Sequence, residues 1–161
     1  MGRVGRLDEV RAAAAVARRR GHGVIFTNGA FDLLHVGHVR YLRGARQLGP
    51  DDLLVVAVNS DASVRRAKGP ERPVMPLAER MEIVAAIAGV DWVLELDADT
   101  ADGLIEALRP EIHAKGSDYT VQSVPERPTV EAAGGRVIIV GDPKDHSTSG
   151  VIDAIVRGSS E

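Results

Sequence analysis

Two histidines, His35 and His38, lie three residues apart at the start of a predicted helix in the segment FTNGAFDLLHVGHVRYL, residues 26–42. Side chains three apart in a helix project from the same side, so both imidazoles would face one point. Free backbone N–H groups at a helix N-terminus attract anions. Asn28 and Gly29 favour a sharp turn before that helix, because both adopt positive φ at low cost. The pattern predicts a phosphate cradle whose rings donate hydrogen bonds to developing negative charge.

A second anion site is predicted near the C-terminus, where DHSTSGVIDAIV places Ser147, Thr148 and Ser149 at the start of the last helix. Hydroxyls and free N–H groups converge at such a helix end. One hydroxyl is enough to cap a helix, so three in succession indicate phosphate binding. Lys144 would add a positive charge nearby. Gly37, between the two histidines of the first site, leaves space where a side chain would obstruct a phosphate.

Other functions remain open for the histidine pair. Asp32, His35 and His38 follow one another at three-residue steps, which also fits a two-histidine, one-carboxylate metal site and hence a metal hydrolase. A purely structural role is a further alternative. Phe31 and the glycine turn favour phosphate over metal, because a phosphate pocket explains them and metal binding does not. Neither GxxxxGK[ST] nor GxGxxG is present, so a nucleotide would be bound by another arrangement.

Length and composition limit the class of protein. The 161 residues predict a single domain over 1–161, with an N-terminal helix over about 8–20 and a core over about 24–157. Hydrophobic residues make up 44% and charged residues 27%, which is typical of soluble globular proteins. A net charge of −3 gives no basic field for nucleic acid, so local donors must hold any anion. The absence of cysteine, and of any apolar run near ~20 residues, predicts a cytoplasmic protein without a membrane partner.

Apolar runs and helical patterns alternate along the chain. Strands are predicted at residues 24–27, 53–59, 90–96, 111–116 and 136–141. The run LLVVAVN, residues 53–59, lacks polar positions, as is typical of a strand covered on both faces. Helical patterns lie between these runs, and Thr100 is the predicted N-cap of one helix. The order predicts an α/β fold: one Rossmann-like, doubly wound parallel sheet of about five strands flanked by helices, with ligands bound at the carboxyl ends of the strands.

Two motifs carry a resemblance to a known superfamily. HVGH, residues 35–38, is the HxGH form of the HIGH motif, and HSTSG, residues 146–150, is similar to the ISTS-type motif of the same nucleotidyltransferases. Within that superfamily the chain from about Phe26 to Ile155 resembles the adenylyltransferase domain that makes ADP-heptose from heptose 1-phosphate. The segments that carry this likeness include VAVNSDASVRRAKGPERPV, AERMEIVAAIAGVDWV, RPEIHAKGSDYT and AAGGRV.

The resemblance implies an enzyme that transfers AMP from ATP, with Mg²⁺, to heptose 1-phosphate and releases pyrophosphate. In many members this domain is fused to a sugar kinase, and the family is frequently oligomeric. A cytidylyltransferase acting on glycerol 3-phosphate is the nearest alternative, and a non-catalytic nucleotide sensor is an alternative of another class. Ala30 in place of cysteine, Ser117 in place of the second glycine of KGGDY, and the segment TVQSVPERPTVEAAGG depart from the family pattern.

The same resemblance implies roles for residues at the matching positions. The catalytic residues would be His35, His38 and Lys68. The residues that bind the nucleotide or its phosphates would be Thr27, Asn28, Gly29, Gly37, Arg72, Lys115, Gly116, Ser147, Thr148 and Ser149. The residues on the substrate side would be Phe31, Asp32, Asn59, Asp61, Arg80, Asp118 and Tyr119.

Overall fold

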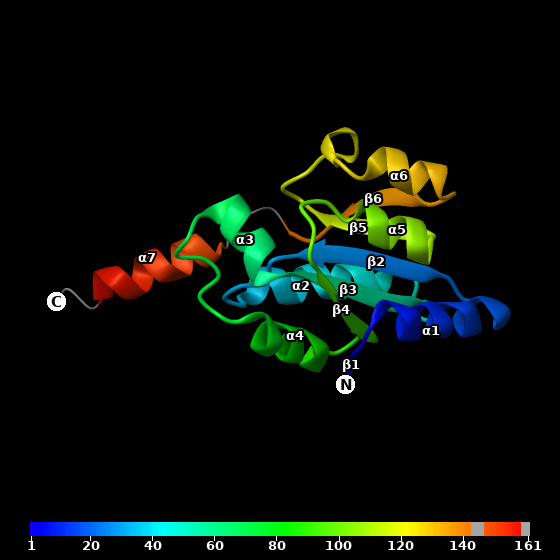
Figure 1. Ribbon diagram of the computed structural model, residues 1–161, viewed down its shortest axis with the longest axis horizontal. Coiled ribbons are helices and arrows are strands. Elements are labelled where there is room, and N and C mark those ends of the chain that lie inside the picture. The colour runs from blue at the N-terminus through cyan, green and yellow to red at the C-terminus, as the bar shows by residue number, and fades with distance from the viewer. Residues whose placement is uncertain (143–146, 159–161) are drawn as a thin grey trace.

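A parallel β-sheet forms the centre of the protein, as Figure 1 shows in a computed structural model that describes residues 1–142 and 147–158. Within these residues the sheet has six strands, and every neighbouring pair is parallel. In spatial order the strands are β1 (Arg3–Val4), β4 (Trp92–Leu96), β3 (Leu53–Asn59), β2 (Val24–Gly29), β5 (Ile112–Gly116) and β6 (Arg136–Val140). Lys144, the predicted positive charge near the site, lies outside the described residues.

The predicted Rossmann-like sheet is confirmed, and five of its strands coincide with the five predicted apolar runs. The expected count of about five strands is corrected to six by β1. This strand has only two residues, both exposed, so it leaves no apolar pattern in the sequence. Backbone hydrogen bonds to distant residues hold it at the sheet edge, from Gly2 N–H to the Ala85 carbonyl and from Arg3 N–H to the Asp91 carbonyl.

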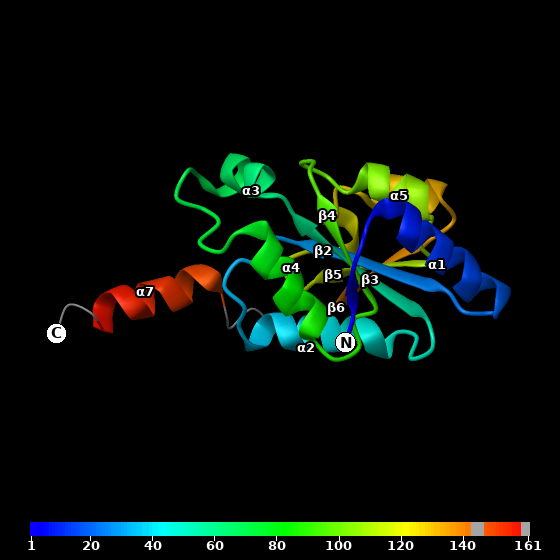
Figure 2. The same cartoon turned by 60° about the horizontal axis from the view of Figure 1, so that its bottom comes forward.

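Helices cover both faces of the sheet (Figures 1 and 2). One face carries α1, α5 and α6, and the other carries α2 and α4. In the described residues the helices are α1 (Leu7–Arg19), α2 (Val36–Gln47), α3 (Asp61–Lys68), α4 (Leu77–Ala86), α5 (Asp102–Leu108), α6 (Arg127–Ala132) and α7 (Thr148–Gly158), with a 3₁₀ turn at Val121–Ser123. None of these described helices is long and apolar enough to cross a bilayer. The predicted N-cap Thr100 is corrected to Ala101, since the Thr100 hydroxyl instead donates to the Asp102 carboxylate.

The central strands bury side chains on both faces. In β3, Val55 and Ala57 join the apolar cluster under α1 and α5, whereas Leu54, Val56 and Val58 join the cluster under α2 and α4. All five are fully buried. The sequence LLVVAVN therefore has no alternation of polar and apolar residues, because water meets neither face of this strand.

The order of the strands reverses next to β2. From β2 the chain moves outward to β3 and β4, and it then returns to place β5 on the opposite side of β2. The reversal therefore lies between β2 and β5, which pair directly through Ile25 and Phe26. In open α/β sheets, ligands bind beyond the carboxyl ends of the strands at such a point.

Arg80 on α4 is a buried clamp that joins three separate segments at that edge of the sheet. Its side chain is 0% exposed. The guanidinium donates to the carbonyl of Ala30 after β2, to the carbonyl of Met75 before α4 (2.9 Å), and to the carboxylate of Asp61 in the first turn of α3 (2.7 Å). All three acceptors would lose their partner together if the guanidinium were removed.

We expect Arg80→Ala to lower the free energy of unfolding by about 3–5 kcal/mol, the range for breaking a buried ion pair by removal of one partner. Urea unfolding followed by circular dichroism measures this change. The control is Arg66→Ala, which removes an ion pair with Asp99 whose side chains are 51% and 74% exposed. Exposed pairs contribute at most about 1 kcal/mol. Equal effects of the two substitutions would contradict the clamp.

Candidate active site

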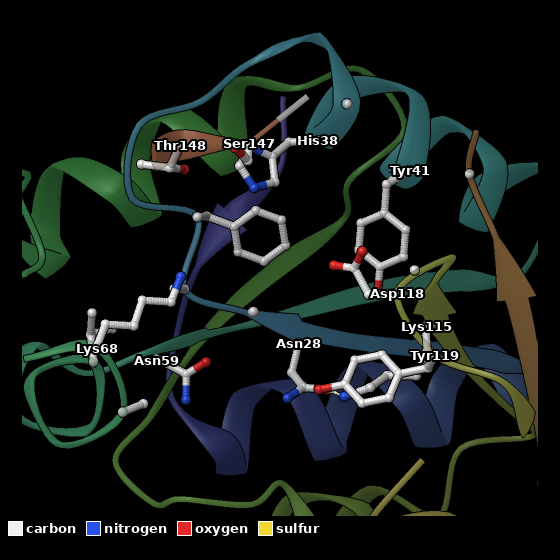
Figure 3. A pocket seen from close by; sticks show the side chains of 18 of the residues that line it. Asn28, His38, Tyr41, Asn59, Lys68, Lys115, Asp118, Tyr119, Ser147 and Thr148 are labelled. Carbon is white, nitrogen blue, oxygen red and sulfur yellow. Dashed lines mark hydrogen bonds between the residues drawn. The ribbon is translucent and has the colours of Figure 1, made fainter. Parts of the chain in front are cut away.

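A cavity of about 1070 Å³ opens at the carboxyl ends of β2 and β5, where the strand order reverses. Figure 3 shows His38 and Thr148 on one side of this cavity and Asn28 and Lys115 on another, with Lys68 reaching in from α3. Most of the predicted site residues line it, namely Asn28, Gly29, Phe31, His35, Gly37, His38, Asn59, Lys68, Arg72, Lys115, Gly116, Asp118, Tyr119, Ser147, Thr148 and Ser149. Segments far apart in the sequence thus converge on one space, at the upper end of small-molecule site volumes.

The two histidines form a stacked pair at the start of α2. His35 is the N-cap residue and His38 is the third residue of the helix, and their ring centroids are 4.0 Å apart. The backbone N–H of His35 donates to Nδ1 of His38 at 3.4 Å. Because Nδ1 accepts this bond, the proton of a neutral ring stands on Nε2. Burial, followed by the charges of His35 and Lys68, lowers the pKa of His38 to about 4. At pH 7 the His38 ring is therefore a neutral donor.

The sharp turn before α2 occurs at Phe31, with φ of 46°, and not at Asn28 and Gly29 as the sequence predicts. Both of those residues still pair with β3, so they keep extended backbone to the end of β2. Gly29 is needed for another reason: a Cβ there would lie 3.1 Å from the Phe31 ring. The Phe31 ring in turn lies 5.3 Å from the His38 ring, so the strand end, the turn and the histidine pair pack together.

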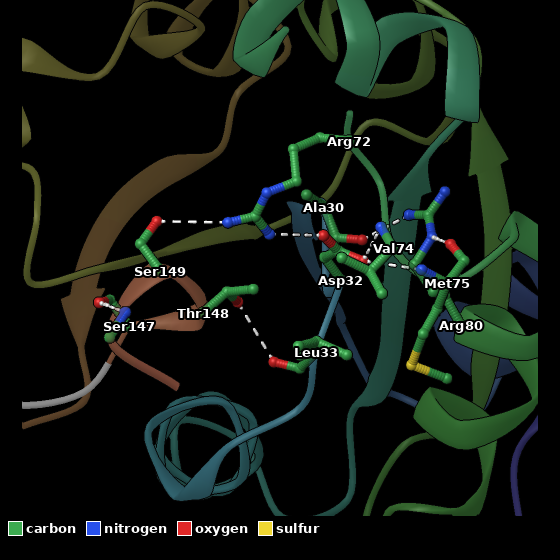
Figure 4. A network of polar contacts seen from close by, with 11 residues as sticks. Ala30, Asp32, Leu33, Arg72, Val74, Met75, Arg80, Ser147, Thr148 and Ser149 are labelled. Atoms are coloured by element: carbon green, nitrogen blue, oxygen red, sulfur yellow. Dashed lines mark hydrogen bonds and ion pairs between the residues drawn. The ribbon is translucent and has the colours of Figure 1, made fainter. Parts of the chain in front are cut away.

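The three hydroxyl residues at the start of α7 make three different contacts. Ser147 caps the helix, since its Oγ accepts from Gly150 N–H at 3.0 Å. The Thr148 hydroxyl donates to the Leu33 carbonyl at 3.2 Å, which fastens α7 to the segment before α2 (Figure 4). Arg72 donates to the Ser149 hydroxyl at 3.4 Å. The start of α7 therefore lines the cavity on the same side as His38 (Figure 3).

Lys115 supplies a buried positive charge on the opposite side of the cavity. Its ammonium lies 3.1 Å from Oδ1 of Asn28 and 3.4 Å from the carboxylate of Glu126. The Tyr119 ring centroid is 5.0 Å away. Burial lowers the pKa of Lys115, and the Glu126 carboxylate opposes that shift. The charge is thus held by protein groups at the cavity wall.

Four predicted site residues do not line the cavity. Thr27 is fully buried, and its hydroxyl contacts the hydroxyl of Tyr41. Asp61 pairs with Arg80 as part of the clamp. Arg80, predicted to face substrate phosphates, has a buried guanidinium whose Nε, Nη1 and Nη2 atoms each donate to a protein acceptor. Asp32, predicted near the acceptor, is 1% exposed and lies behind the cavity wall.

The Asp32 carboxylate accepts hydrogen bonds from the loop before α4. It accepts from the Arg72 guanidinium and Val74 N–H, both at 2.8 Å, and from Met75 N–H at 3.0 Å (Figure 4). Burial alone would raise the pKa of Asp32, but these bonds lower it below its usual value. The alternative metal triad with the two histidines is therefore not formed. Among residues 1–142 and 147–158 no three His, Asp or Glu side chains are grouped to hold a metal ion.

The cavity lining also contains polar residues that the sequence did not predict to belong to the site. Ser63 and Arg66 lie on α3, and Asp99 and Thr100 follow β4. Glu126 enters from the segment before α6. Asp99 and Thr100 could have been found, because the carboxyl ends of neighbouring parallel strands meet at one edge. Glu126 had no such signal, since it follows a 3₁₀ turn that no sequence pattern indicates.

Comparison with known proteins identifies the family. The model of the Cytidylyltransferase-like family matches residues 26–154. The bifunctional protein HldE of Syntrophotalea carbinolica is 50% identical over 92% of this chain, and that of Geobacter sulfurreducens is 46% identical over 99% of it. The chain spans only 30% and 32% of these two relatives, about a third of their length.

Two solved structures share the fold. A lipopolysaccharide core biosynthesis protein from Thermoplasma volcanium superposes with a TM-score of 0.64 at 23% identity, covering 75% of this chain and 98% of its own. Pantothenate synthetase from Thermus thermophilus gives 0.61 at 20% identity, covering 93% of this chain and 64% of its own. The structure agrees with the family match, because the HxGH histidines and the STS hydroxyls line one cavity. This chain belongs to the cytidylyltransferase-like family and is a nucleotidyltransferase.

Proposed function

We propose that this protein transfers AMP from ATP to heptose 1-phosphate, releasing pyrophosphate and forming ADP-heptose. The observation that carries the proposal is the cavity shared by the HVGH histidines and the STS hydroxyls. The choice of nucleotide and acceptor rests on the resemblance of several segments to the ADP-heptose-forming domain. Identity of 46–50% with bifunctional HldE proteins supports an enzyme of that kind.

The donors in the cavity suit a triphosphate. Lys68, Arg72 and Lys115 line the cavity, and the N-termini of α2 and α7 open into the same space. Helix N-termini bind phosphate through free N–H groups and the helix dipole. The neutral His38 ring adds a directional donor through Nε2. Binding and orientation of a polyanion therefore need no further protein group.

In the proposed reaction, an oxygen of the acceptor phosphate attacks the α-phosphorus of ATP. The bond from that phosphorus to the bridging oxygen of the β-phosphate breaks, and pyrophosphate leaves. Acceptor phosphate is already a nucleophile at pH 7, so no covalent enzyme intermediate is required. His38 and Lys68 would donate to oxygens that gain charge, and such preorganised donors lower the barrier electrostatically.

We expect Mg²⁺ to enter with ATP. Among the described residues, no three or more acidic or histidine side chains are grouped so that they could hold a metal ion. We therefore assign the ligands of Mg²⁺ to phosphate oxygens and water, which this hard cation prefers in triphosphate sites. When bound, it offsets negative charge on the triphosphate.

The substrate pair can be tested directly by incubating the protein with Mg²⁺, ATP or CTP, and a panel of sugar 1-phosphates and glycerol 3-phosphate. We expect pyrophosphate release with ATP and heptose 1-phosphate. Release with CTP and glycerol 3-phosphate instead would replace the proposal with the cytidylyltransferase alternative. Tight ATP binding by calorimetry, without pyrophosphate from any acceptor, would favour a nucleotide sensor.

His38→Ala should lower turnover by about 10²–10³-fold, the scale for loss of one donor to developing negative charge. The thermal unfolding midpoint should change little by comparison, because the ring lies at a cavity rather than in the apolar core. His22→Ala is the matched control, since His22 lies in the turn between α1 and β2 and does not line the cavity. Near-normal turnover of the His38 variant would refute its role.

The neutral state of His38 predicts acid sensitivity of the fold. Its pKa in the folded protein is about 4, below the ordinary 6.5, so only the unfolded chain binds this proton between those values. The free energy of unfolding should therefore fall as the pH falls below about 6.5. His113, whose pKa burial lowers to about 3, adds a second proton in the same direction.

His38→Gln should remove one of these two contributions. The loss of stability between pH 7 and pH 5 should then be smaller by about 1–2 kcal/mol than in the unaltered protein. Urea unfolding at both pH values measures it. An identical pH dependence in the variant and the unaltered protein would show that His38 does not resist protonation in the folded state.

A further inference from the structure

The carboxamide of Asn28, at the end of β2, receives two donors on one atom. Nε2 of His113 and Nζ of Lys115 both lie 3.1 Å from Oδ1 of Asn28. Both donors come from β5, the strand that pairs with β2 across the reversal of strand order. The side chain of Asn28 is therefore held from beneath the cavity by the neighbouring strand.

Lys115 decides which way the amide points. An ammonium group only donates hydrogen bonds, so the atom facing it must be the amide oxygen and not the NH₂ group. His113 then has to donate to the same oxygen, which requires its proton on Nε2. The other ring nitrogen, Nδ1, is buried and has no hydrogen-bond partner among the described residues. One tautomer of His113 is thus selected by a lysine two residues away on the same strand.

The surroundings of His113 keep its ring neutral and fixed. The residue is 0% exposed, and its ring lies 5.4 Å from that of Phe26. Burial is the main cause of the lowered pKa of His113, with the Lys115 charge second and Asp102 opposing. A buried donor with a single orientation can hold its acceptor without competition from water.

The opposite end of the Asn28 amide is left for a ligand. Asn28 lines the cavity, and its NH₂ group has no acceptor within the described part of the chain. With Oδ1 turned toward β5, the two N–H bonds are directed away from the buried network. They match an oxygen acceptor, such as a phosphate or hydroxyl oxygen of a bound substrate.

We propose that His113 is a positioning residue: together with Lys115 it locks the Asn28 carboxamide so that its NH₂ group faces the cavity as a fixed hydrogen-bond donor to substrate oxygen. The turnover test of this proposal rests on the proposed nucleotidyl transfer, whereas the tautomer test does not. The proposal predicts that His113 acts on substrate only through Asn28. Removal of Asn28 should therefore make His113 irrelevant to turnover.

A double-mutant cycle tests this dependence with His113→Leu, Asn28→Ala and the double variant, all measured as kcat/KM in the pyrophosphate assay. His113→Leu should lower kcat/KM roughly 10- to 100-fold, the scale of a misplaced substrate contact. In the Asn28→Ala background it should lower kcat/KM no further. An equal further loss in that background would overturn the proposal, because His113 would then act through packing.

His113→Gln provides the conservative control, since its amide can donate from a position close to that of Nε2. We expect it to keep kcat/KM within a few-fold of the unaltered protein, while His113→Leu does not. Thermal unfolding of both variants separates this effect from loss of fold. Equal impairment of the Gln and Leu variants at matched stability would contradict the positioning role.

The tautomer can be read without any substrate. Nitrogen-15 NMR of the histidine rings in the whole protein distinguishes protonated from unprotonated nitrogens, and the His113→Gln spectrum identifies the signals of His113. We expect the proton on Nε2 at pH 7. A proton on Nδ1, or on both nitrogens, would overturn the proposal. If the assay detects no pyrophosphate but Nε2 carries the proton, the proposed function fails while the locked amide stands.

Discussion

The site depends on one constraint, the reversal of strand order beside β2 in a sheet whose strands are all parallel. Parallel strands need crossover connections, and these are right-handed. The crossover that leaves β2 runs through α2 on one face, and the crossover that enters β5 runs through α5 on the other. No helix therefore covers the carboxyl ends of β2 and β5. The cavity is the space that this topology leaves, and residues from distant segments meet there because their strands end there.

Ion pairs between largely buried side chains hold together the segments that form the walls of this space. Asp32 holds the loop that carries Arg72, and Arg80 joins that loop to the turn after β2 and to α3. Charges withdrawn from water are stabilising only when their partners are in place, so each pair enforces the geometry that satisfies it. Arg72 is an example: its guanidinium donates both to Asp32 and to the hydroxyl of Ser149, so it links the loop before α4 to the start of α7.

Much of the fold could be predicted, because the burial of a strand and the start of a helix are encoded by residues next to one another in the sequence. A run such as LLVVAVN must be buried on both faces, and HVGH after a strand must begin a helix. The strand β1 could not be predicted, because its pairing with β4 defines it and its own two exposed residues give no pattern. The left-handed backbone at Phe31 could not be predicted either, because glycine and asparagine usually adopt this conformation and the sequence offers Asn28 and Gly29 just before it.

For the site, the sequence predicts which segments converge but not which way each charged side chain faces. Arg80 and Asp32 both lie in segments that match the family, yet both side chains point into the protein. Asp32 bonds to residues at least 40 positions away in the sequence, and Arg80 bonds to residues 19 and 50 positions away. No local pattern reveals such distant partners. His113 presents the opposite case. Within the strand EIHAKG it carries no motif, and only the register of β5 against β2 brings its ring to Asn28.

His38 is arranged at this site as a neutral donor rather than as a charge. A proton on Nδ1 of His38 would break its bond from the His35 backbone, and the second ring and Lys68 oppose a charge there. Positive charge instead comes from Lys68, Arg72 and Lys115, spread around the cavity. Because the neutral His38 ring adds no charge of its own, its stacking on the His35 ring at 4.0 Å brings no repulsion between two imidazolium ions. The oriented hydrogen bond therefore comes from His38 and the positive charge from the lysines and arginine. The orientation of the imidazole does not depend on a charge on its own ring.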